Sequence, residues 1–133
     1  NPKPHILLSG WRRQYVISRL INADITYSYF EMVTLNTLNQ LYNCLDLYLV
    51  TSRYEGGPQA VIECASNKTP ILSTDVGIAN KILVEKCVLN DKLDFINNIK
   101  LHRFDFSTEN YNKIQKFKMK YILPKYLRFL KSI

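Results

Sequence analysis

The sequence predicts an α/β fold with a parallel sheet, and two observations lead to this prediction. Short runs rich in β-branched and aromatic residues alternate with segments whose apolar residues recur at helical spacing. Strands and helices that alternate in this way are typical of parallel sheets joined by crossover helices. The chain has 133 residues, which is enough for roughly one domain. It contains no internal repeat, low-complexity segment or linker, so we expect one domain.

The first half of the chain is expected to contain three strands and two helices. Apolar runs at 5–9, 25–30 and 45–50 are the predicted strands. A helix is expected over 12–21, where the apolar side chains fall on one side. Thr34 is a good N-cap for the next helix, because its hydroxyl can accept a hydrogen bond from an unpaired N–H of the first turn.

The second half repeats the pattern and then becomes less regular. Pro58 suits the first turn of a helix that runs to about Ser66, since proline pre-sets the helical backbone angle. Residues 70–74 are the next predicted strand. Beyond it, Asn90 or Asp91 is expected to cap a helix with apolar positions at steps of three.

The last segment of the chain carries the entire net charge of +7. Residues 1–109 hold 11 basic and 11 acidic side chains, whereas 110–133 hold seven basic and no acidic ones. Ser107 is expected to cap a helix here, and Pro124 to kink or stop it, because proline lacks the N–H donor. A basic amphipathic helix can lie on an anionic membrane. Any electrostatic partner is therefore expected at this end of the chain.

Composition excludes several classes of protein. Hydrophobic residues are 47% and charged residues 22%, which does not fit a disordered, collagen-like or coiled-coil chain. No apolar stretch approaches the roughly 18 residues of a membrane-spanning helix. Cys44, Cys64 and Cys87 form no zinc spacing with His5 or His102, so we expect reduced thiols that act as small core hydrophobes in the cytosol. The first residues include no initiator Met, and we expect a piece of a longer protein.

The stretch 52–63 carries the chemistry. It follows a predicted strand and opens a helix, which is where ligands bind in open α/β sheets. Gly56 and Gly57 allow the backbone to turn sharply and approach a ligand, and the start of the helix favours an anion such as a diphosphate. Glu63 lies roughly 7.5 Å further along the helix, where its carboxylate can accept hydrogen bonds from ribose hydroxyls. With Glu55 able to do the same for a sugar, this pattern indicates a nucleotide-sugar site.

Seven residues separate Glu55 from Glu63, and this spacing resembles the signature of retaining glycosyltransferases of family 4, the group 1 enzymes with the GT-B fold. The likeness covers about 5–83. Further residues match in register: Ser52, Gly56, Thr69-Pro70 and Asp75-Val76-Gly77. The resemblance implies a Rossmann-like three-layer parallel sheet, the C-terminal lobe of a GT-B enzyme. Residues 1–133 would be the donor-binding lobe, with 107–133 as its C-terminal basic helix.

The resemblance also implies a role for each matched residue. Glu55 would be the catalytic residue and would contact the donor sugar hydroxyls. The backbone from Gly56 to Gln59 would lie beside sugar and phosphate, and Glu63 would hold the ribose. The complete donor-binding set is Ser52, Glu55, Gly56, Gly57, Pro58, Gln59 and Glu63. The family needs no metal and no cofactor, because the nucleotide-sugar is a substrate.

The implied activity is transfer of a hexosyl group from a nucleotide-diphosphate sugar to an acceptor, with retention of configuration, in polysaccharide, glycolipid or glycoprotein synthesis. The acceptor would be held by an N-terminal lobe of the same protein, so this chain alone is expected to be inactive. We expect a cytoplasmic enzyme, with peripheral contact to an anionic membrane through 110–133 as an additional possibility. No nucleic acid partner is expected.

Three positions depart from the family pattern. Lys68 stands where a glycine usually ends the helix, so the helix must end through Asn67 or a strained Lys68. Ile78 replaces a second glycine, and Lys81 replaces an acidic residue. The Arg and Lys that usually grip the diphosphate belong to a strand–helix unit that precedes the matched region.

Two other interpretations remain open. A sugar-nucleotide epimerase shares the two-lobed fold, although the Glu55–Glu63 register favours a transferase. A non-enzymatic module that binds membranes or nucleic acid is the second alternative, and it would be centred on 110–133.

Overall fold

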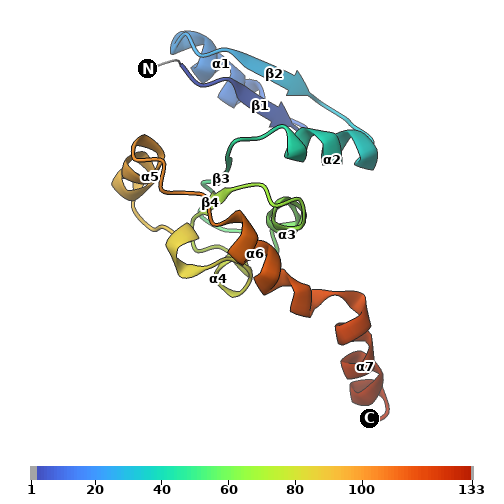
Figure 1. Ribbon diagram of the computed structural model, residues 1–133. Coiled ribbons are helices and arrows are strands. Elements are labelled where there is room, and N and C mark those ends of the chain that lie inside the picture. The colour runs from blue at the N-terminus through green and yellow to red at the C-terminus, as the bar shows by residue number, and fades with distance from the viewer. Residues whose placement is uncertain (1–2, 133) are drawn as a thin grey trace. The chain divides into compact units, whose positions relative to one another are not determined.

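The computed structural model describes residues 3–132, in which strands and helices alternate as predicted (Figure 1). The strands are β1 (Ile6–Ser9), β2 (Tyr27–Phe30), β3 (Tyr48–Val50) and β4 (Ile71–Ser73). The helices are α1 (Gln14–Asn22), α2 (Leu35–Asn43), α3 (Gln59–Ser66), α4 (Ala79–Ile82), α5 (Lys92–Lys100), α6 (Ser107–Ile114) and α7 (Met119–Leu130). Two short 3-10 turns are η1 (Glu85–Cys87) and η2 (Gln115–Phe117).

The described strands pair in parallel, which confirms the predicted α/β class. β1 pairs with β2, with Ile6 opposite Tyr27, and β3 pairs with β4, with Tyr48 opposite Ile71. Two separate two-stranded sheets result among the described residues, so the Rossmann-like three-layer sheet stays a prediction. The chain divides into two compact units, 1–40 and 41–133.

The first unit is a β1–α1–β2 crossover without a buried residue in its described part, 3–40. Polar contacts join its strands instead. The ring nitrogens of His5 hydrogen-bond to the hydroxyls of Thr26 and Ser28, both at 2.9 Å. Tyr29 OH donates to the carbonyl of Gly10 at 3.1 Å. His5 is therefore a structural residue that joins β1 to β2.

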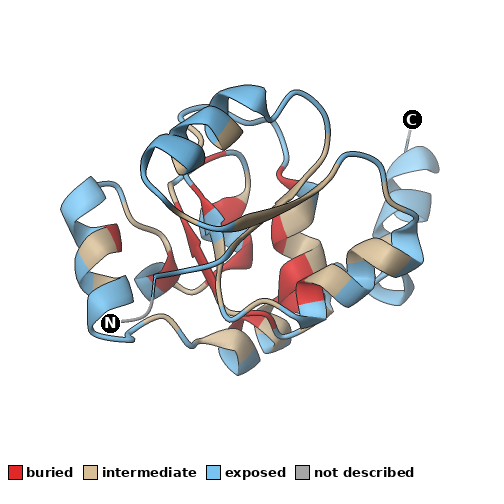
Figure 2. Ribbon diagram, turned by 90° about the horizontal axis from the view of Figure 1, so that it is seen from above, coloured by how far each residue is buried: buried red, intermediate tan, exposed pale blue. Residues whose placement is uncertain are grey.

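The hydrophobic core belongs to the second unit. All three residues of β4 are buried, and α3 contributes Val61, Cys64 and Ala65 to the same core (Figure 2). Cys64 and Cys87 are fully buried, as predicted for small core hydrophobes, but Cys44 is exposed near the end of α2. The prediction was wrong for Cys44 because that position follows the last turn of α2 and points to solvent.

Asn110 anchors α6 to this core, although it is polar and completely buried. Its Oδ1 accepts a hydrogen bond from the backbone N–H of Val84 at 2.9 Å, and its Nδ2 donates to Cys87 Sγ at 3.4 Å. Both ends of the amide are satisfied, so its burial is compatible with a stable core. Ile114, one turn further along α6, is also buried.

Two of the predicted helix caps are confirmed. The backbone N–H of Thr37 donates to Thr34 Oγ1 at 3.2 Å, and that of Leu93 donates to Asp91 Oδ1 at 2.6 Å. Ser107 is not the cap of its helix but its first residue.

The end of the chain differs from the prediction of one helix that Pro124 kinks or stops. The helix breaks earlier, at Lys118, whose ψ of 143° is extended. α7 then begins afresh at Met119 and continues through Pro124 to Leu130. Pro124 lies beyond the first turn of α7, where a proline removes a backbone donor and crowds a preceding carbonyl, and yet it does not end the helix.

Candidate functional site

Most of the residues singled out by the sequence lie in the loop 51–58, between β3 and α3, whereas Gln59 and Glu63 belong to α3. Because β3 and β4 are parallel, the segments that follow them emerge at the same edge of the sheet. Hydrogen bonds from Thr74 join these segments. The backbone N–H of Thr74 donates to the carbonyl of Val50 at 2.9 Å, and Thr74 Oγ1 donates to the carbonyl of Ser52 at 2.6 Å. The base of the loop is thus fixed to the turn that follows β4.

Gly77 completes this connection. Its φ of +54° lies in the left-handed region, and a Cβ placed on it would meet Gly56 O at 2.9 Å, Glu55 O at 3.0 Å and Pro58 Cδ at 3.0 Å. Only a glycine allows the turn 75–77 to approach the loop so closely. Gly77 was not among the predicted binding residues, although its place in the Asp75-Val76-Gly77 motif was a usable signal.

Gly56 and Gly57 were expected to allow a sharp turn of the backbone, but they do not use the left-handed conformation that is special to glycine. Neither has a φ in the left-handed region, and a Cβ on either would have no neighbour within 4 Å. Both glycines are exposed. The conformation that requires a glycine is therefore at Gly77, while the two loop glycines leave free space on the solvent side of the loop.

Glu55 lies at the rim of an open depression of about 470 Å³. The residues that line the depression come from both loops: Arg53, Tyr54, Glu55, Gly56, Asp75, Val76 and Gly77. Ser52 is half-buried, and its hydroxyl donates a short hydrogen bond to Glu55 Oε1. This contact orients the exposed carboxylate and leaves its second oxygen available to a hydroxyl group.

The start of α3 lies directly after the loop. Pro58 is buried and takes the N-cap position, with an extended backbone, so the helix begins one residue later than predicted. The N–H of Val61 donates to Pro58 O at 3.1 Å. No partner within the described residues occupies the N–H groups of Gln59 and Ala60, as is usual for a first helical turn. This turn can therefore attract an anion.

The carboxylate of Glu63, in α3, is held by a hydrogen bond from a residue that was not predicted to belong to the site. Tyr42 OH donates to Glu63 Oε2 at 2.7 Å, and the tyrosine is buried. Burial, followed by the hydrogen bond to Glu63, raises the pKa of Tyr42 above its ordinary value. The hydroxyl was the signal that it needs a polar partner when buried.

The structure thus places the two glutamates in separate pairs, Glu55 with Ser52 and Glu63 with Tyr42. Glu63 is half-buried on α3 and does not line the depression at Glu55. Ser52, Gly57, Pro58 and Gln59 also lie outside that lining, although Ser52 contacts it through Glu55.

The far end of α3 confirms one of the two expected endings. Lys68 has a φ of +56°, so the strained-lysine alternative is correct. Its ammonium group lies 5.0 Å from the centroid of the Tyr111 ring, a cation–π contact that helps to hold it there. The next residue, Thr69, is buried and donates from Oγ1 to Tyr42 O at 2.9 Å.

Within residues 3–132, no three His, Cys, Asp or Glu side chains come together as a metal ion would require.

Comparison with known proteins gives a match in structure but not in sequence. No family model matches the chain, and no curated protein is significantly similar to it. Among solved structures, that of TarM, a GT-B glycosyltransferase, matches 95% of this chain with a TM-score of 0.70 and 19% sequence identity. The chain has the fold of part of a GT-B glycosyltransferase. It spans 28% of the length of the TarM chain.

This similarity confirms the predicted relation to GT-B enzymes at the level of the fold. Membership of family 4, retention of configuration and the donor-binding role stay predictions.

Proposed function

We propose that this chain is the donor-binding lobe of a retaining glycosyltransferase of family 4. In this proposal it binds a nucleotide-diphosphate sugar, and the hexosyl group passes to an acceptor held by an N-terminal lobe of the same protein. The enzyme would act in the cytoplasm, in the synthesis of a polysaccharide, glycolipid or glycoprotein. The GT-B fold supports this proposal, since a bilobed transferase needs one lobe for each substrate.

The observation that carries the proposal is the close approach of Gly77 to the carbonyls of Glu55 and Gly56. It joins the loops that follow β3 and β4 into one surface. That surface presents the carboxylate of Glu55, and the loop that carries it leads into the first turn of α3. A carboxylate oriented by Ser52, in a loop that ends at unpaired N–H groups, suits a ligand with a hydroxyl-rich end and an anionic end.

The parts of the donor are assigned accordingly. The sugar hydroxyls meet Glu55, which Ser52 orients. The diphosphate lies beside the exposed backbone of Gly56 and Gly57 and the N–H groups of Gln59 and Ala60. Glu63 receives the ribose through the carboxylate oxygen that Tyr42 does not occupy.

In this proposal no metal ion or cofactor takes part in transfer. The charge that develops on the leaving diphosphate is stabilised by donors fixed in advance, the first turn of α3 and a basic side chain. Arg53 is the basic residue that lines the depression at Glu55.

A panel of nucleotides tests the proposal. UDP, GDP, ADP and CMP are added separately to the wild-type chain and to Gly57→Val, and the thermal midpoint is recorded. We expect one nucleoside diphosphate to raise the midpoint of the wild type, because a ligand at 100 times its Kd stabilises by about 2.7 kcal/mol. Gly57→Val should fold normally, since a Cβ has free space there, and should lose the shift. If no nucleotide shifts the wild type, or the variant responds equally, the proposal is wrong.

A further inference from the structure

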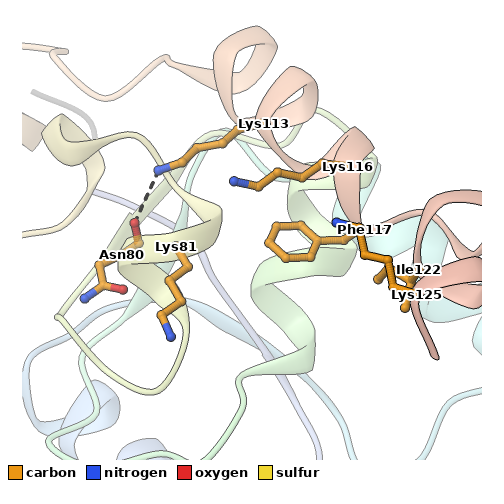
Figure 3. Close-up of a pocket in the computed structure, with 7 residues that line it drawn as sticks. All are labelled: Asn80, Lys81, Lys113, Lys116, Phe117, Ile122 and Lys125. Carbon is orange, nitrogen blue, oxygen red and sulfur yellow. Dashed lines mark hydrogen bonds between the residues drawn. The ribbon is translucent and has the colours of Figure 1, made fainter. Parts of the chain in front are cut away.

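A second site lies away from the loops that follow β3 and β4. It is a pocket of about 580 Å³ formed by α4, α6, η2 and α7 (Figure 3). Four lysines line it together with one amide and two apolar side chains: Lys81, Lys113, Lys116, Lys125, Asn80, Phe117 and Ile122. No carboxylate is part of the lining, so the pocket is strongly electropositive.

Within residues 3–132, no acidic side chain forms an ion pair with these lysines. The one ion pair among the described residues joins Lys3 to Asp24, in the other unit. Lys113 Nζ donates to the carbonyl of Asn80 at 3.2 Å and to that of Leu83, which fixes the ammonium group at one wall (Figure 3). Lys116 lies over the Phe117 ring, 5.2 Å from its centroid. Four like charges around one cavity repel each other, and an anion between them would relieve this repulsion.

α7 forms one wall of the pocket, and the same helix carries an exposed apolar face next to it. Ile122 and Lys125 line the pocket, and Tyr126 and Phe129 follow Ile122 at steps of four and three, on the same side of the helix. No residue of α7 is buried, and Tyr126 and Phe129 are 64% and 62% exposed. Leu123 and Leu130 widen the apolar face, while Lys120 and Arg128, with Lys131 just after the helix, lie away from it, and Leu127 falls beside Lys120.

We propose that the lysine pocket and α7 together form a docking face for an anionic lipid bilayer. The headgroup phosphate enters the pocket among Lys81, Lys113, Lys116 and Lys125. The apolar side of α7 lies at the boundary between headgroups and acyl chains, with its basic side chains toward the lipid phosphates.

Two observations favour a lipid surface over a soluble phosphate or a protein. A soluble phosphate would use the lysines but would leave the large apolar side chains of α7 in water. A protein partner would have to match seven basic side chains of 110–133 with carboxylates, because this segment has no acidic residue of its own. None of the described helices is long and apolar enough to cross a bilayer.

Vesicle sedimentation without nucleotide tests the proposal independently of donor binding. The full chain is mixed with phosphatidylglycerol–phosphatidylcholine vesicles or pure phosphatidylcholine vesicles, at 0.1 M and 0.5 M NaCl. We expect binding to the anionic vesicles alone, and its loss at 0.5 M NaCl, because screening then acts within a few ångströms. Absence of binding to anionic vesicles overturns the proposal and leaves α7 as a docking element for another lobe. Equal binding to both vesicle types also overturns it, because the lysines would then play no part.

Two variants that each remove two positive charges show whether the lysine pocket itself is responsible for vesicle binding. Lys116→Gln/Lys125→Gln removes two pocket charges, and Lys92→Gln/Lys100→Gln removes two exposed charges of α5. The pocket variant should bind anionic vesicles roughly 25-fold more weakly, about fivefold for each lysine, and the α5 variant should bind within about twofold of the wild type. Equal loss in the two variants contradicts the proposal, because net charge alone would then explain binding. Inorganic phosphate at 10 mM that displaces the chain completely from the vesicles would identify a soluble anion as the ligand and would also contradict it.

Discussion

Gly77 approaches the carbonyl of Gly56 so closely that a Cβ on Gly77 would lie 2.9 Å from that oxygen. These two glycines belong to different loops, one after β4 and one after β3. Their contact involves backbone atoms on both sides, which cannot move aside as the end of a flexible side chain can. The shape of the candidate site therefore depends on the absence of a side chain at Gly77.

Gly77→Ala should destabilise the chain by about 2–3 kcal/mol, because it adds a clash to a backbone conformation that costs 1–3 kcal/mol for a residue with a Cβ. Gly57→Ala, the matched control in the partner loop, should change the free energy of unfolding by less than about 0.5 kcal/mol. Urea denaturation measures both. Similar values for the two variants would show that the loops are not packed as described.

Glu63→Ala should weaken binding of a ribonucleotide more than binding of its 2′,3′-dideoxy analogue. Hydrogen bonds to a charged acceptor contribute roughly 1.5–3 kcal/mol each, and the dideoxy compound cannot make them. Titration calorimetry with both ligands gives the comparison. Equal losses would show that Glu63 does not contact the ribose.

Tyr42→Phe is the companion variant, because it removes the hydrogen bond to Glu63 Oε2 and keeps the ring. Loss of this bond should lower the free energy of unfolding by about 1 kcal/mol. Discrimination between ribose and dideoxyribose should decrease only partly, since the glutamate itself remains. Complete loss of discrimination would mean that the tyrosine hydroxyl, and not the carboxylate, binds the sugar.

The chain should lose stability at alkaline pH. Burial raises the pKa of the Cys64 and Cys87 thiols above their ordinary value, and the pKa of Tyr42 is raised as well. Above about pH 8.5 the unfolded thiols release protons that the folded state retains. The free energy of unfolding should therefore be constant up to about pH 8 and then decrease, by at most about 1.4 kcal/mol per pH unit for each group.

Cys64→Ala provides the control for this pH dependence. It lowers stability at every pH through lost packing, but the slope above pH 8.5 should be shallower than in the wild type. Urea unfolding at pH 7, 8, 9 and 10 gives the slopes. If the slope is unchanged in Cys64→Ala, the Cys64 thiol of the wild type does not contribute to the loss of stability at alkaline pH.

The 133-residue chain should not transfer sugar by itself. Transfer requires an acceptor hydroxyl held near the anomeric carbon, and this positioning supplies a large part of the rate. In the proposed enzyme that task belongs to another lobe, which closes over the donor. Product analysis with a panel of sugar nucleotides, with and without Mg²⁺ or Mn²⁺, should detect no turnover. Measurable turnover would place an acceptor site within these residues.

Much of the fold could be predicted because its signals are local. Runs of apolar residues gave all four strands, and the hydroxyl of Thr34 and the carboxylate of Asp91 gave two caps that depend only on neighbouring N–H groups. The end of the chain could not be predicted in the same way. The break at Lys118 follows no glycine or proline, whereas Pro124, a strong local signal, lies within a helix that continues.

In the candidate site too, features set by nearby residues could be predicted and contacts between distant residues could not. The loop, the two glutamates and the helix start were predictable from spacing in the sequence. The contact of Gly77 with Gly56 and the bond of Tyr42 to Glu63 were not, because each joins residues 21 positions apart that the fold brings together. The same limit explains why the sharp turn was expected at Gly56 and Gly57, whereas the left-handed backbone is found at Gly77.

In the proposed function, the loop after β3 and the first turn of α3 bind a nucleotide-diphosphate sugar. A ¹⁵N–¹H NMR titration of the wild-type chain with the nucleotide selected by thermal shift observes this binding residue by residue. We expect saturable shifts of the backbone amides of Gly56, Gly57, Gln59 and Ala60, with little change at Lys113 and Lys116. Saturable binding whose shifts are confined to the lysine pocket, with the loop amides unchanged, would contradict the proposed function.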